Sequence, residues 1–149
     1  MLIWVASYPR SGNRLFRTAL ETGWGFPGPS VFDAAERERA AGARRLPDPA
    51  NDPQIGEFRV ASGPHFLKTH LLSHAETHDP AVVLVRDGRD SAISYAHFMQ
   101  QRPGLGRGRS FEELLMSVIE TRNATFGDWS ASVEAWIDRE ATTAVVRAQ

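Results

Sequence analysis

The chain has 149 residues and a formal net charge of -1, with 42% hydrophobic and 23% charged residues, which is typical of one globular domain that buries a core. The balanced charge gives no reason to expect nucleic acid or a membrane surface as a partner, and the absence of cysteine excludes disulfides and thiolate chemistry. No apolar run approaches the roughly 20 residues that span a bilayer. The amino terminus lacks the basic region of a signal peptide, so we expect a cytoplasmic protein.

The first predicted unit is a strand, a turn and a helix. The apolar run 2–5 predicts a strand, and residues 8–13, Tyr-Pro-Arg-Ser-Gly-Asn, predict a tight turn. The helix that follows is expected to end near Gly23. Its apolar face is expected to consist of Leu15, Phe16, Ala19 and Leu20.

This turn predicts an anion site. A helix that begins directly after a turn presents free backbone N–H groups and the positive end of its dipole. Gly12 lets the backbone approach a ligand closely, Ser11 and Asn13 can donate hydrogen bonds, and Arg10 and Arg14 add positive charge. The alternative is an ordinary strand-to-helix turn with a surface arginine. The turn is not a Walker A loop, because the lysine of that motif is absent.

Residues 24–64 are predicted to contain little regular structure. Pro and Gly make 24–30 a loop, whereas 33–45 is rich in helix formers and charge and is expected to be a solvated helix or a mobile excursion. The stretch 46–64 carries several prolines with little periodicity and is predicted to be a loop. A loop region of this length is expected to carry part of a binding pocket.

A second polar cluster follows a short predicted strand at 66–68. Lys68, the only lysine of the chain, lies two residues from His70, and alternating side chains would put both on one side of a strand. A lysine can neutralise charge on a leaving oxygen, and a histidine near its ordinary pKa can accept a proton from a hydroxyl. The alternative for His70 is a structural histidine. Metal binding needs three or four converging ligands, which the spacing does not supply, so we expect no metal.

A third polar cluster follows the β-branched run 81–85, which predicts a strand buried on both faces. Arg86 ends this strand, and Ser94 lies on the early turns of a helix predicted over 90–99. Both could reach one phosphate. Asp87 and Asp90 are expected to orient arginines or to cap the helix, and a surface Arg/Asp network is the alternative.

The remaining chain predicts two helices and a strand. Residues 101–109 form a Gly/Arg-rich loop, and Ser110 and Glu113 fit a capping box at the start of a helix. A second helix is predicted over 128–139, with Trp129, Val133, Trp136 and Ile137 on one face. The run 142–147 predicts a last strand.

Alternating strands and helices predict one α/β domain, 1–149, with a mostly parallel sheet. Ligands of such sheets bind outside the carboxyl ends of the strands. All three polar clusters follow predicted strands, so we expect them to form one site.

Together the three clusters resemble the cytosolic-type sulfotransferases, which use 3′-phosphoadenosine 5′-phosphosulfate. The 5′-phosphosulfate loop of that family, Y-P-[KR]-S-G-[TN]-T-W, is similar to residues 8–15, and its K-T-H motif matches 68–70. Its 3′-phosphate segment, R-[ND]-x-[KR]-D-x-x-x-S-x-x-x-F, matches 86–98. The resemblance covers nearly the whole chain and implies a P-loop-NTPase-like parallel sheet flanked by helices.

The resemblance implies sulfonate transfer from the nucleotide to the hydroxyl or amine of a small-molecule acceptor. It makes His70 the general base, and it makes Lys68 the residue that steadies the bridging oxygen or the sulfonate. Arg86 and Ser94 would hold the 3′-phosphate. The 5′-phosphosulfate would be bound by Arg10, Ser11, Gly12 and Asn13, with Arg14 as a further candidate. Arginine and lysine supply the countercharge, so no metal is required.

The chain departs from the family in two ways. Arg14 and Leu15 stand where the family usually has threonine and tryptophan. The family also continues beyond the last predicted strand with a basic segment over the 3′-phosphate and helices that cover the sheet. We therefore expect the amino-terminal portion of a sulfotransferase domain, incomplete at its carboxyl end, with an open nucleotide site and an exposed edge.

Two other functions are compatible with these residues. The chain could be a catalytically inactive remnant or a nucleotide-binding module of the same family. A P-loop-like kinase or NTPase is less favoured because the Walker lysine is missing.

Overall fold

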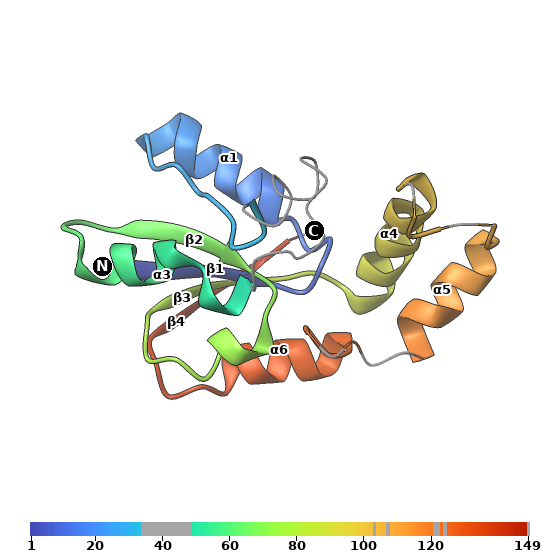
Figure 1. Cartoon of the computed structure of the whole chain (residues 1–149). Helices are drawn as coiled ribbons and strands as arrows, with labels where there is room; N and C mark the ends of the chain where they lie inside the picture. The colour runs from blue at the N-terminus through green and yellow to red at the C-terminus, as the bar shows by residue number, and fades with distance from the viewer. Residues whose placement is uncertain (34–48, 103, 107, 121–122, 124, 149) are drawn as a thin grey trace.

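Four parallel strands form one sheet in the order β2-β1-β3-β4 (Figure 1). The strands are β1 (Leu2–Ser7), β2 (His65–Thr69), β3 (Ala81–Val85) and β4 (Thr143–Arg147). The computed structural model describes residues 1–33, 49–102, 104–106, 108–120, 123 and 125–148. The parallel sheet with helices around it confirms the predicted α/β fold class.

The register aligns the carboxyl ends of the three neighbouring strands that carry the polar clusters. Ala6 of β1 is level with Thr69 of β2, and Ser7 of β1 is level with Leu84 of β3. The residues that follow these strands therefore emerge at one edge of the sheet, as expected from the sequence.

Helices lie on both faces of the sheet and beyond its carboxyl edge. In Figure 1, α1 covers one face and α6 lies under the other, while α4 and α5 extend beyond the strand ends and pack against each other. The helices are α1 (Asn13–Trp24), α3 (Pro53–Val60), α4 (Gly88–Gln101), α5 (Phe111–Glu120) and α6 (Trp129–Ile137). Short 3-10 helices span Pro49–Asn51 and Leu72–His74.

The core lies between the sheet and the helices on the face opposite α1. Trp4, Leu67 and Trp136 are fully buried there. Trp4 stacks on His74 with ring centroids 4.2 Å apart, and its indole N–H donates to Thr77 Oγ1 at 2.9 Å. A continuous apolar core of this kind fixes the sheet, and the sheet in turn fixes the loops at its carboxyl edge.

The prediction of a loop over 46–64 was wrong. Residues 53–60 form α3, which Asp52 caps by accepting a hydrogen bond from the Gln54 N–H at 2.9 Å. Pro53 occupies the first helical turn, where its missing N–H costs nothing. One of the prolines that predicted a loop, Pro53, therefore lies at the start of a helix. The expectation for 33–45 lies almost entirely outside the described residues.

Helix α1 is less buried than its apolar spacing predicted. Leu15 is 77% exposed and Ala19 is also exposed, whereas Phe16 and Leu20 are half-buried. The helix ends at Trp24 and its cap is Gly25, with a φ of 70°, rather than Gly23. The predicted apolar face is therefore only partly covered by the described residues.

The later elements follow the sequence prediction closely. Ser110 N–H donates to Glu113 Oε2 at 2.7 Å and Glu113 N–H donates to Ser110 Oγ at 3.2 Å, which confirms the capping box. In the described residues β4 pairs only with β3. Two of its side chains, Val145 and Val146, are 47% and 39% exposed, so part of the apolar surface of β4 is uncovered within the described residues.

Candidate functional site

The three polar clusters meet at the carboxyl edge of the sheet. Arg10 Nε, from the loop after β1, donates to Ser94 Oγ of α4 at 3.2 Å. Arg86 Nη1, from the end of β3, donates to the Arg10 carbonyl oxygen at 3.4 Å. His70, which follows β2, donates from Nδ1 to the Ser7 carbonyl oxygen at 2.6 Å. Segments that are far apart in sequence thus form one cluster rather than three separate surface turns.

The turn between β1 and α1 has the backbone of an anion cradle. Gly12 has a φ of 90° and precedes α1, which no side chain within the described residues caps. The first N–H groups of any α-helix have no partner inside the helix and are free for a ligand. A Cβ on Gly12 would lie 3.3 Å from the Ala148 Cβ. Glycine is therefore favoured here by both its φ and its close neighbour.

Arg10 adopts a backbone conformation that is unusual for a residue with a side chain. Its φ of 71° lies in the left-handed region, which costs roughly 1–2 kcal/mol for an ordinary residue. Its guanidinium lies 5.3 Å from the centre of the Phe98 ring and bonds to Ser94. The Arg10 guanidinium is thus held against α4, which carries both Ser94 and Phe98.

Tyr8 anchors the same turn. Its ring is buried and meets the edge of Phe126 at 5.6 Å, and Phe126 in turn contacts Tyr95 of α4 at 5.9 Å. Burial, with the nearby Tyr95 and Asp128, raises the pKa of Tyr8 to about 12, so its hydroxyl stays neutral. The turn is thereby fixed to the helix that carries Ser94.

The side chains of Ser11 and Asn13 point into the protein. Asn13 Nδ2 donates to the Val5 carbonyl at 3.1 Å and to Ser7 Oγ at 3.2 Å. Ser11 Oγ lies 3.3 Å from Ser91 Oγ, and both serines are fully buried. Both amide protons of the Asn13 side chain are therefore used to build the turn. Donation to a ligand from this stretch falls to backbone N–H groups.

Arg14 and Leu15 are exposed on the first turn of α1. Among the described residues Arg14 has no recorded hydrogen bond or ion pair. A phosphate contact by Arg14 therefore stays a prediction. Leu15, where the resemblance leads one to expect tryptophan, is open to solvent.

Lys68 and His70 lie beside an aromatic ring that sequence reasoning did not identify. The Lys68 Nζ is 5.3 Å from the centre of the Phe32 ring, and the His70 ring is 5.7 Å from the same ring. Phe32 is placed there because the preceding segment runs along β2: Lys68 N–H donates to the Pro29 carbonyl at 2.9 Å, and Val31 N–H donates to the Lys68 carbonyl at 3.2 Å. No motif predicts this pairing.

The environment of His70 fixes its protonation state. A carbonyl oxygen can only accept, so the contact with Ser7 places the proton on Nδ1 and leaves Nε2 as the basic nitrogen. Burial, with the charges of Lys68 and Arg17, lowers the pKa of His70 from 6.5 to about 3, against a smaller raising effect of the Ser7 carbonyl. The imidazole is therefore neutral at pH 7, and its pKa is far below the ordinary value that the sequence suggested.

The acidic residues of the third cluster have divided roles. Asp87 caps α4 by accepting from the Arg89 N–H at 2.9 Å, and it pairs with the exposed Arg89 side chain at 3.1 Å. This contact lowers the pKa of Asp87 to about 2. Asp90 lies 3.7 Å from Arg86. Capping and orientation of arginines were both predicted for this pair.

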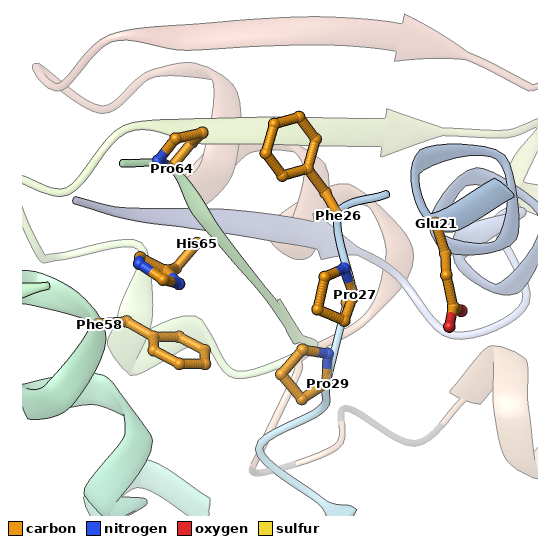
Figure 2. Close-up of a pocket in the computed structure, with 8 residues that line it drawn as sticks. Glu21, Phe26, Pro27, Pro29, Phe58, Pro64 and His65 are labelled. Atoms are coloured by element: carbon orange, nitrogen blue, oxygen red, sulfur yellow. The ribbon is translucent and has the colours of Figure 1, made fainter. Parts of the chain in front are cut away.

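An apolar pocket of about 420 Å³ lies along the outer edge of β2 (Figure 2). It is lined by Glu21, Phe26, Pro27, Gly28, Pro29, Phe58, Pro64 and His65. Most of these residues come from the region 24–64, where the sequence predicted part of a binding pocket. The rings of Phe58 and His65 stack at 4.8 Å and form one wall.

The described residues contain neither a metal-binding cluster nor a membrane-spanning helix. No group of three or more His, Cys, Asp or Glu side chains there is placed to hold a metal ion. No helix within the same residues is long and apolar enough to cross a membrane.

Comparison with known proteins identifies one family. The chain matches the family model for the sulfotransferase domain over residues 2–146. No curated protein sequence matches the chain.

Solved structures with the same fold include sulfotransferases. Mouse sulfotransferase SULT7A1 complexed with PAP matches with a TM-score of 0.68 and 16% identity, over 98% of this chain and 50% of that one. Retinol dehydratase matches in two complexes, with androsterone and the inactive cofactor PAP (TM-score 0.55) and with retinol and PAP (0.56). Both have 21% identity and cover 97% of this chain and 53% of theirs. The chain thus spans about half the length of these structures.

Proposed function

The chain belongs to the sulfotransferase domain family, and we propose that it transfers a sulfonate group from 3′-phosphoadenosine 5′-phosphosulfate to a hydroxyl or amine of a small-molecule acceptor. The observation that carries the proposal is the contact of Arg10 with both Ser94 and Arg86. These contacts join the first and third clusters, and the hydrogen bond of His70 to the Ser7 carbonyl joins the second cluster to them at the same edge of the sheet. The similar solved structures contain PAP, which agrees with a bisphosphate nucleotide as the ligand.

The described residues suit a nucleotide with two separate phosphate groups. The free N–H groups at the start of α1, with Gly12 and Arg10, would hold the 5′-phosphosulfate. Arg86 and Ser94, which both contact Arg10, would hold the 3′-phosphate. Arginine forks bind phosphate oxygens in pairs, so they are suited to both positions.

The acceptor would lie beside Lys68 and His70. His70 Nε2, whose lone pair is free because Nδ1 carries the proton, would take the proton of the acceptor hydroxyl or amine. The acceptor atom then forms a bond to sulfur as the bond from sulfur to the phosphate oxygen breaks, and PAP leaves with the electron pair. Lys68 would stabilise the charge on that leaving oxygen.

The low pKa of His70 belongs to the chain without nucleotide. Two of its causes are the positive charges of Lys68 and Arg17. A bound polyanion would offset those charges and raise the pKa, because an opposite charge favours the protonated form. We propose that the nucleotide thus makes His70 a stronger base when it binds.

The pocket beside β2 is the surface that we propose for the apolar part of an acceptor. Pro29 lines the pocket and also accepts a hydrogen bond from the Lys68 N–H, so one wall of the pocket is joined to the backbone of the proposed catalytic lysine. Its walls of phenyl and proline rings suit an apolar molecule with few charges.

A nucleotide-binding module without catalysis is the second candidate. The environment of His70 favours it, because burial lowers the pKa of His70 to about 3 and makes it a weak base in the free chain. The two functions share the nucleotide site and differ only in turnover.

Nucleotide binding is tested by calorimetry with PAP. We expect the wild-type chain to bind PAP, and Arg86→Ala to weaken binding at least tenfold. The matched control is Arg89→Ala, since Arg89 is exposed on the same turn and pairs with Asp87. No binding of PAP would overturn both candidate functions.

Turnover is tested by mass spectrometry of a panel of phenols, alcohols and amines incubated with the sulfated nucleotide. We expect sulfated products that are lost in Lys68→Ala and His70→Ala, while PAP binding is retained. Binding of PAP with no product from any acceptor would favour the binding module.

A further inference from the structure

Trp129, the first residue of α6, contacts the backbone on which Arg86 is carried. Its Nε1–H donates to the Arg86 carbonyl oxygen at 3.0 Å, although the two residues are 43 positions apart. Its ring lies against Gly88, where a Cβ would be 2.8 Å from Trp129 Cδ2. One indole therefore touches the residues on both sides of Asp87, the cap of α4.

The Arg86 side chain is weakly held by its own contacts. Its Nε is buried without a hydrogen-bond partner in the described residues, and its Nη1 reaches the Arg10 carbonyl only at 3.4 Å. Its ion pair with Asp90 is 3.7 Å long, and the Asp90 side chain is 57% exposed. Exposed pairs of this kind contribute little. The direction of the guanidinium therefore depends largely on where the backbone is held.

Helix α6 gives Trp129 a fixed position. The helix begins at an N-cap, because Asp128 Oδ1 accepts from the Ala131 N–H at 2.8 Å. Seven residues along, Trp136 is fully buried in the core. The contact between Trp129 and Arg86 thus connects the end of β3 to a helix that is anchored in the interior.

We infer that Trp129 is a positioning residue for recognition of the 3′-phosphate. It holds the Arg86 carbonyl and thereby directs the Arg86 guanidinium, and it needs no contact with the nucleotide itself. The inference rests on the proposed function, in which Arg86 binds that phosphate. The sequence placed Trp129 only on the apolar face of a helix.

The test compares affinity for PAP with affinity for adenosine 5′-phosphate, which lacks the 3′-phosphate, measured by calorimetry. Trp129→Phe keeps a ring against Gly88 and removes the N–H. We expect it to lower the preference for PAP severalfold, because the Arg86 guanidinium is then less well positioned, with binding of the 5′-phosphate unchanged. In an Arg86→Ala background the same substitution should lower the preference no further, because the two residues act together.

Two further variants separate positioning from stability. Trp136→Phe also replaces an indole by a phenyl ring on the same helix, but in the core, where the indole N–H has no partner within the described residues, and it should leave the preference unchanged. Gly88→Ala keeps Trp129 but displaces its ring, because the added Cβ would clash with it. It should reduce the preference for PAP as Trp129→Phe does. It therefore tests the inference even if Trp129→Phe folds poorly. An unchanged preference in folded Trp129→Phe or in Gly88→Ala would overturn the inference. A wild-type chain that binds both nucleotides equally would overturn the 3′-phosphate assignment itself, and the inference with it.

Discussion

At the scale of single residues, the site is built from side chains whose hydrogen bonds decide what remains for a ligand. Asn13 donates both side-chain amide protons within the protein, and His70 donates its Nδ1 proton to the Ser7 carbonyl oxygen. The groups left for a ligand are backbone N–H groups, the N–H donors of Arg10 and Arg86 that their own hydrogen bonds do not use, and His70 Nε2. Such a division supports binding of an anion next to a neutral base.

His70 makes stability depend on pH. Its pKa is about 3 in the folded chain and ordinarily 6.5, so the unfolded chain binds the proton more readily between these values. The stabilisation from keeping this histidine neutral is complete above pH 6.5 and is lost progressively as pH falls toward 3. We expect the free energy of unfolding to drop by about 2 kcal/mol from pH 7 to pH 5 on this account, measured by urea denaturation.

The matched variant for this prediction is His70→Asn, whose side-chain amide can still donate to Ser7. It should remove most of the drop between pH 7 and pH 5, whereas His78→Asn, at an exposed histidine, should leave it unchanged. The lowered pKa values of Asp79 and Asp87 act below their ordinary value of 3.8, so these two groups contribute little between pH 5 and pH 7. An equal drop in His70→Asn would contradict the assignment of the pH dependence to His70.

The sequence could predict which residue types gather at the site but not which way they face. Arg10, Arg86 and Ser94 were predicted from motif spacing, and the structure joins them. Phe32 was not predicted, because its place beside Lys68 depends on the segment at Pro29 pairing with the edge of β2. Such pairings between distant segments leave no local pattern in the sequence.

At the scale of elements, strands and helices with strong periodicity were predicted well and α3 was missed. The run 81–85 and the capping box at Ser110 carry local signals that the structure confirms. Helix α3 has almost no amphipathic pattern, and its composition includes Pro53 and Gly56. Its start is set instead by the cap at Asp52, a single residue among several prolines.

The cap of α3 should contribute measurably to stability. Asp52 is buried, with an exposed fraction of 6%, and its carboxylate accepts a hydrogen bond from the Gln54 N–H. Asp52→Ala leaves that N–H unpaired and should lower the free energy of unfolding by about 1 kcal/mol in urea denaturation. Asp52→Asn keeps an oxygen at the same place and should retain most of the stability. Equal losses in both variants would show that the cap is not the cause.

At the scale of the whole molecule, the order β2-β1-β3-β4 explains why one edge of the sheet collects the chemistry. Parallel strands point their carboxyl ends the same way, and β1 lies between β2 and β3. Residues 10, 70 and 86 therefore follow three adjacent strands. That the clusters emerge at one edge of the sheet was predictable from the sequence, because it follows from strand direction alone. The strand order and the register come from packing that no local pattern encodes.

The same topology leaves β4 as an edge strand in the described residues, and this predicts self-association of the isolated chain. An edge strand offers unpaired backbone groups to another chain, and Val145 and Val146 add exposed apolar surface to it. We expect sedimentation velocity to show larger species as the concentration of the 149-residue chain rises. Val145→Lys should shift the chain toward monomer, because a charge on an edge strand disfavours further pairing.

The matched control for the β4 edge is Val60→Lys. Val60 is 86% exposed at the end of α3, so the substitution adds the same charge and removes the same apolar side chain away from the edge. Charge alone would disperse both variants equally, whereas edge pairing predicts that only Val145→Lys becomes monomeric, with the circular dichroism of all three chains unchanged. A wild-type chain that stays monomeric at every concentration would mean that β4 does not pair in solution.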